Sequence, residues 1–187
     1  AETENRKRGR KGLPHVTPLY TLADVERTLR QLVPLPYEKK REILPGISIC
    51  FQDAGHILGS ACVEVWMQAG PLRRKLVFSG DLGQYDTPIL RDPTALTEAD
   101  LVIMESTYGD RTHPPYEDEI KRVEHIVAET YKRGGSVLIP AFAVGRTQQV
   151  VYMLHQLRLK GDLPDMPIFV DSPLAINATA VYGSHPE

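Results

Sequence analysis

The sequence predicts an α/β protein, and three observations lead to that class. In the first half, short runs alternate apolar and polar residues, which is the period of half-buried strands. After Pro115, helix-like segments alternate with short apolar runs, a pattern typical of βαβ units. The composition is that of an ordinary folded domain, since 42% of the 187 residues are hydrophobic and 25% are charged.

Composition also excludes several classes of protein. No apolar run reaches the length of a membrane span, and the charged N-terminus lacks the apolar segment of a signal peptide. The net charge of −2 excludes a uniformly basic nucleic-acid binder. Only two cysteines are present, Cys50 and Cys62, so we expect a reduced, cytoplasmic protein without a membrane partner.

The N-terminal part combines a basic run with a predicted helix. Residues 6–11 hold five cations, which suit either an arm that contacts phosphate or a solvated helix end, and we favour the helix end. Thr21 is a helix cap and Asp24 favours a helix N-terminus, so a helix is predicted over 21–33. Its apolar residues recur at helical spacing and predict one buried stripe, made of Leu22, Val25, Leu29 and Leu32.

Strands dominate the next stretch of the chain. Residues 37–44 read as a short strand or extended link, and Pro45-Gly46 is a turn signal. The alternating runs that follow predict a mainly antiparallel sheet, with strands over 47–53, 61–68 and 75–79. A further apolar run predicts a strand over 101–105.

The last third predicts alternating helices and strands. Helices are expected over 116–133 and 147–159 and from about Pro173, and strands over 137–139 and 168–170. The change of pattern near 106–116 is the predicted domain boundary, which gives one part over 1–105 and another over 106–187.

Three candidate site residues follow three of the predicted strands. His56 lies in a glycine-rich link, whereas Asp81 and Glu105 come directly after apolar runs. Side chains at neighbouring strand ends meet on one rim of a sheet, where a histidine with carboxylates suits a divalent metal. Taken singly, each of them also suits a turn or a helix cap. His113, in the loop after Glu105, has equal claims as a cleft residue and as a surface residue.

Longer motifs surround these residues. They are Asp-Ala-Gly-His-Ile-Leu-Gly-Ser-Ala around His56, Phe-Ser-Gly-Asp-Leu-Gly around Asp81 and Glu-Ser-Thr-Tyr-Gly-Asp-Arg from Glu105. Together and in this order they closely resemble the metallo-β-lactamase superfamily, in particular its β-CASP nucleases. The resemblance runs from about Leu19 to the end of the chain. It implies part of an αββα sandwich, followed by the start of a β-CASP helix-sheet-helix domain.

The resemblance also implies roles for the three residues. It makes His56 a zinc ligand, Asp81 the bridge between two zinc ions, and Glu105 the residue that orients a catalytic histidine. The family's His-x-His-x-Asp-His run, which supplies most metal ligands, is absent from these 187 residues. We therefore expect the chain to be an internal part of a longer protein and to be inactive by itself.

Two loops are candidate RNA contacts. Gly145, Arg146 and Thr147 precede a predicted helix, where free N–H groups and a guanidinium suit a phosphate. The motif around them resembles a β-CASP motif that faces the active-site cleft, although an ordinary loop capped by Thr147 is the alternative. Ser172 repeats the arrangement at the next strand-to-helix junction, with less support.

The function implied by the resemblance is zinc-dependent hydrolysis of RNA phosphodiesters, with two zinc ions in a complete active site. The expected partners are an RNA substrate and either a second copy of the chain or an RNA-processing complex. Three alternatives stay open: a nuclease of the same fold that acts on DNA, an enzyme for a small ester or thioester, and a non-catalytic β-CASP scaffold. Glu105 and the residues after it argue against the small-molecule enzyme, which lacks the β-CASP part.

Overall fold

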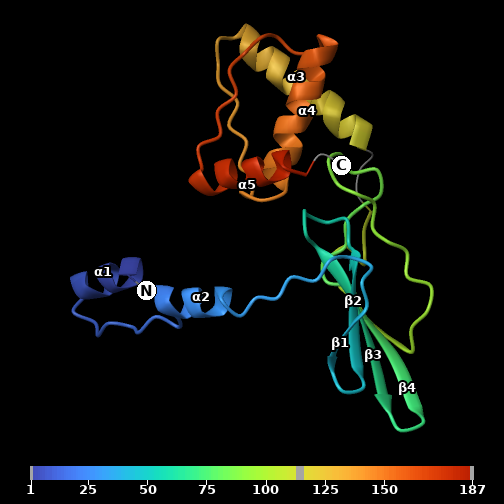
Figure 1. The fold of residues 1–187 in the computed structure, drawn as a ribbon. Coiled ribbons are helices and arrows are strands. Elements are labelled where there is room, and N and C mark those ends of the chain that lie inside the picture. The colour runs from blue at the N-terminus through green and yellow to red at the C-terminus, as the bar shows by residue number, and fades with distance from the viewer. Residues whose placement is uncertain (1, 113–115, 186–187) are drawn as a thin grey trace. The chain divides into compact units, whose positions relative to one another are not determined.

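The structure, a computed structural model, describes residues 2–112 and 116–185 and forms two compact units, Ala1–Leu35 and Pro36–Glu187. The first unit contains the helices α1 (Glu2–Arg10) and α2 (Leu22–Leu29). The second contains a five-stranded sheet followed by three helices (Figure 1). No helix in the described part of the chain is long and apolar enough to cross a membrane.

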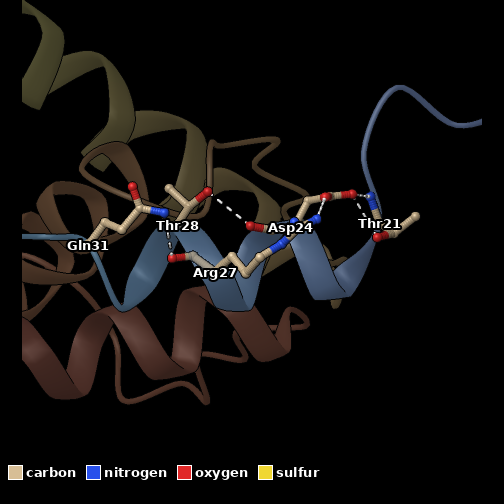
Figure 2. Close-up of polar contacts among 5 residues, drawn as sticks. All are labelled: Thr21, Asp24, Arg27, Thr28 and Gln31. Atoms are coloured by element: carbon tan, nitrogen blue, oxygen red, sulfur yellow. Dashed lines mark hydrogen bonds and ion pairs between the residues drawn. The ribbon is translucent and has the colours of Figure 1, made fainter.

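The first unit is charged and open to solvent. Helix α1 carries most of the basic run and buries no residue, which agrees with a solvated helix. Helix α2 begins at the predicted cap: the N–H and the hydroxyl of Thr21 both donate to Oδ2 of Asp24, at 2.8 and 2.7 Å (Figure 2). Arg27 pairs with the other carboxylate oxygen of Asp24, and the hydroxyl of Thr28 donates to the Asp24 carbonyl (Figure 2).

The prediction of a buried stripe on α2 was wrong. Helix α2 has no buried residue, and the side chains of Leu22, Leu29 and Leu32 are 81%, 60% and 65% exposed. Helical spacing shows that these residues share a face, but burial needs a second surface. Within the first unit no described residue supplies that surface.

The sheet matches the predicted strands closely. Its strands follow chain order: β1 (Arg41–Leu44), β2 (Ile47–Asp53), β3 (Ala61–Ala69), β4 (Leu72–Phe78) and β5 (Leu101–Ile103). Strands β1 to β4 pair antiparallel, as their alternation and short turns predict, and β5 joins β4 in parallel. The mainly antiparallel sheet is thus confirmed.

Three helices follow the sheet: α3 (Tyr116–Lys132), α4 (Arg146–Lys160) and α5 (Pro173–Gly183). All three confirm the predicted helices to within a residue. A small core of Val127, Leu154, Leu157 and Leu163 joins α3 to α4 and to the segment after α4.

The predicted strands over 137–139 and 168–170 were wrong, because neither segment is part of the sheet in the described part of the chain. Leu138 and Phe169 at their centres are 92% and 84% exposed. A strand exists only where a neighbouring backbone completes its hydrogen bonds, and none of the described residues pairs with either segment.

Candidate active site

The sheet topology brings the three candidate loops to one rim. Strands β2 and β4 are both antiparallel to β3, so they run in the same direction, and β5 is parallel to β4. The C-terminal ends of β2, β4 and β5 therefore lie at the same end of the sheet. His56, Asp81 and Glu105 each follow one of these ends within three residues.

His56 and Asp81 face each other across this rim. Nε2 of His56 lies 3.9 Å from Oδ2 of Asp81, and both side chains are open to solvent, with 43% and 76% exposed. The His56 loop is shaped by Ser60, whose hydroxyl oxygen accepts from the N–H groups of His56 and Ile57 at 3.1 and 3.2 Å. Tyr37 donates to the Ser60 carbonyl at 2.7 Å, which fixes the base of the loop.

Glu105 is turned toward the Asp81 loop. Its Oε1 accepts the N–H of Leu82 at 2.6 Å, and its own N–H donates to the hydroxyl of Ser79 at 3.1 Å. The Leu82 N–H holds the pKa of Glu105 below its ordinary value, and the Thr107 side chain adds to the effect. A carboxylate with this environment stays ionised and orients its neighbours.

The His56 and Asp81 loops also interlock through their backbones. The N–H of Gly83 donates to the carbonyl of Ala54 at 2.8 Å. A Cβ on Gly83 would overlap the carbonyl of Gly55 and lie 2.6 Å from the N atom of His56. Only glycine allows this approach, so the Gly-Asp-Leu-Gly motif places Asp81 beside His56.

The pair fits a metal ion as part of a ligand set. Two ligand atoms bound to one zinc at about 2.0–2.1 Å in tetrahedral geometry are about 3.4 Å apart, so the observed 3.9 Å needs only a small side-chain movement. An imidazole with a carboxylate is a donor combination that zinc accepts. Among the described residues no third His, Cys, Asp or Glu gathers with them to complete a site.

The α4 junction presents an exposed guanidinium, but two of the N–H groups that were expected to be free are occupied: the N–H of Arg146 donates to the Val144 carbonyl at 3.2 Å and that of Thr147 to the Phe142 carbonyl at 3.3 Å. Gly145 is the N-cap of α4 with φ of +81°, Arg146 opens the helix with an exposed side chain, and Thr147 is in the first turn. The Thr147 hydroxyl donates to the Phe142 carbonyl at 2.7 Å, so it closes the preceding loop and is not the cap. The alternative of a Thr147 cap was therefore wrong.

Gln148 anchors this junction. It is 4% exposed, and its Nε2 donates to the Ala143 carbonyl at 3.1 Å and to the Thr179 hydroxyl at 3.0 Å. Its Oε1 has no hydrogen-bond partner in the described part of the chain.

Two further candidate residues, Ser172 and His113, gain no support as site residues from the structure. Ser172 caps α5, and its hydroxyl oxygen accepts the N–H of Ala175 at 3.2 Å, so this side chain has a structural task. Its role as an RNA contact stays a prediction. His113 lies outside the described residues.

Sequence reasoning missed Tyr182, which lies on α5. Its hydroxyl accepts the N–H of Leu58, two residues after His56, at 3.2 Å. A contact across 124 positions leaves no local pattern, and a tyrosine in an apolar helix reads as core. Ser60 and Gly83 were within the quoted motifs, and the signal for them was the small residues that bracket His56 and Asp81.

Comparisons with known proteins identify a domain family and several relatives of the chain. A family model described as the Beta-Casp domain matches residues 147–187. Ribonuclease TTHA0252 of Thermus thermophilus is 41% identical over 165 residues, which are 88% of this chain and 37% of that protein. Transcription termination factor FttA of Methanosarcina mazei is 38% identical, over 90% of this chain and 26% of its own length.

A eukaryotic relative matches as well. Cleavage and polyadenylation specificity factor 73 of Drosophila melanogaster is 32% identical over 169 residues, which are 89% of this chain and 24% of that protein. The chain thus spans between 24% and 37% of the length of these relatives. It belongs to the β-CASP group of the metallo-β-lactamase superfamily.

Proposed function

We propose that the protein containing these residues is a zinc-dependent phosphodiesterase that cleaves RNA. The observation that carries the proposal is the pairing of His56 with Asp81 at 3.9 Å on the sheet rim. The names of the relatives support the choice of substrate, because they include a ribonuclease and a cleavage factor. The DNA-directed and scaffold alternatives have no comparable observation in their favour.

In this proposal His56 and Asp81 would be two of the protein ligands that hold the zinc ions of a two-zinc site. Bound zinc supplies a nucleophile at neutral pH and stabilises charge on the phosphoryl oxygens. Glu105 keeps the Asp81 loop in place through Leu82 and orients the acid that protonates the leaving oxygen. Arg146 contacts the RNA backbone through its exposed guanidinium, which favours phosphate and does not read a base.

The test uses the complete protein with Asp81→Ala. Cleavage of a labelled RNA should fall at least about a thousandfold, as for loss of a group that acts on the reacting centre, whereas RNA affinity should change little. Thr87→Ala is a matched control in the loop after Asp81, where the Thr87 hydroxyl donates to the Gln84 carbonyl and to no other described residue. Undiminished cleavage by Asp81→Ala would remove the metal role, and equal cleavage of a matching DNA strand would remove the preference for RNA.

Three further properties belong to the same proposal. The protein works in the cytoplasm, and it acts as a homodimer or within an RNA-processing complex. The 187-residue chain alone binds zinc weakly and cleaves little RNA, because two ligands hold zinc poorly. Calorimetry of this chain should therefore show no tight stoichiometric zinc binding.

A further inference from the structure

The His56 loop contacts the helical part of the second unit at two successive residues. The N–H of Leu58 donates to the hydroxyl of Tyr182 on α5 at 3.2 Å. Ile57 packs against the N-cap of α4, where a Cβ on Gly145 would lie 2.6 Å from Cγ2 of Ile57. The two contacts follow His56 directly in the chain, so they act on the segment that carries the imidazole.

Among the described residues, the other hydrogen bonds of this loop stay within the sheet part. Ser60 binds the N–H groups of His56 and Ile57, the Asp53 carboxylate accepts the N–H of Gly55, and Gly83 binds the Ala54 carbonyl. These bonds set the internal shape of the loop and its attachment to the Asp81 loop. The bond to Tyr182 joins the loop to the helical part of the same unit.

Tyr182 itself is held by its helix. One turn before it on α5, the Thr179 hydroxyl accepts from Nε2 of Gln148 at 3.0 Å and donates to the Ala175 carbonyl at 2.8 Å. Gln148 lies in the first turn of α4, three residues after Gly145. The contacts therefore form a closed ring from the His56 loop through α5 and α4 back to the loop.

We propose that Tyr182 is a positioning residue: by holding the Leu58 peptide, it fixes the direction in which His56 presents Nε2 toward Asp81. This inference rests on the proposed function, because it takes His56 to be a zinc ligand. The hydrogen bond between Leu58 and Tyr182 is observed independently of that role. Loss of the hydroxyl leaves the ring of Tyr182 and the fold of α5 in place. It frees the Leu58 N–H and lets the imidazole turn away from the metal.

The test compares Tyr182→Phe with Tyr131→Phe in the complete protein. Tyr131 is half exposed on α3, and its hydroxyl makes no hydrogen bond to another described residue, which makes it a matched control. Hydrogen exchange of the Leu58 amide should speed up in Tyr182→Phe only. Zinc affinity, measured by competition with a chelator, should fall about 10–100-fold, the range for residues that orient a metal ligand. Cleavage by Tyr182→Phe should recover as zinc is raised, which a merely structural defect would not allow.

Each outcome separates this inference from the proposed function. Unchanged Leu58 exchange in Tyr182→Phe would overturn the hydrogen bond, and faster exchange with unchanged zinc affinity would overturn the positioning role alone. His56→Ala provides the reference for the ligand role. If His56→Ala leaves zinc affinity unchanged, the proposed function of His56 is wrong, and the positioning role of Tyr182 falls with it.

Discussion

The backbone N–H of Leu82 donates a 2.6 Å hydrogen bond to Oε1 of Glu105, across 23 positions of sequence. Leu82 directly follows Asp81, so the carboxylate of Glu105 holds the peptide next to the second candidate metal ligand. Ser79 makes the reciprocal contact, because its hydroxyl accepts the N–H of Glu105 at 3.1 Å. Two hydrogen bonds, one from each segment, therefore join the loop after β4 to the loop after β5.

This relationship predicts the effect of removing the carboxylate. In Glu105→Ala the Leu82 N–H loses its acceptor, and its hydrogen exchange should speed up about tenfold or more, since bonds to charged groups are among the stronger ones. Glu105→Gln keeps an acceptor oxygen without the charge and should show a smaller increase. Exchange measured by NMR on both variants checks this, and equal protection in all three proteins would contradict it.

Gly83 should tolerate no side chain. A Cβ there meets the backbone of Gly55 and His56, which cannot move aside without breaking the loop, so Gly83→Ala should lower the free energy of unfolding by about 3 kcal/mol or more. Gly59→Ala is the control in the neighbouring loop: with φ of +86° and open space around it, it should cost only about 1–2 kcal/mol. Urea titrations of both variants measure the difference, and equal losses would argue against the interlock.

The small core between α3 and α4 gives a prediction about stability. Leu157 is 4% exposed, so Leu157→Ala should lower the free energy of unfolding by about 2–5 kcal/mol. Leu159 lies on the same helix with 68% of its side chain exposed, and Leu159→Ala should change stability by less than about 0.5 kcal/mol. Denaturation followed by circular dichroism measures the free energy of unfolding of both variants. Similar losses would contradict the burial of Leu157 in this core.

The α4 junction predicts a change in RNA binding that depends on salt. Arg146→Ala in the complete protein should weaken binding to all RNA sequences about equally. It should also reduce the slope of log affinity against log salt concentration by about one phosphate contact. Lys160→Ala, at the other end of the same helix, is the control and should leave the slope unchanged. Binding titrations at several salt concentrations decide the matter. Overlapping lines for wild type and Arg146→Ala would mean that the arginine touches no phosphate.

The cap of α2 predicts a pH dependence. Hydrogen bonds from the Thr21 side chain, its backbone N–H and Arg27 lower the pKa of Asp24 below the ordinary aspartate value. A lowered pKa means that the cap is fully present above the ordinary value and is lost only as pH falls through the lower, folded-state value. The NMR shift of the Thr21 amide should follow that titration. Asp24→Asn should abolish it, and a midpoint at the ordinary aspartate pKa would contradict the structure.

Local patterns predicted the parts of the fold that depend on neighbours in sequence. Alternation identified β2, β3 and β4 because each pairs with the next along the chain, and the cap at Thr21 identified the start of α2. Pairing and burial depend on distant surfaces, so the segment 137–139 and the apolar stripe of α2 were mispredicted. His56, Asp81 and Glu105 were found because strand ends fall on a common rim, whereas Tyr182 reaches that rim only through the tertiary fold.

The sequence separations at the rim have a consequence for the order of folding. Strands β1 to β4 form a meander of near neighbours, while the Leu58–Tyr182 bond closes 124 positions, and long closures are slow. We expect a nascent chain to complete its sheet well before His56 is fixed, because α5 must first leave the ribosome. Kinetic φ-values near zero at Tyr182, with higher values in β2 and β3, would match this order.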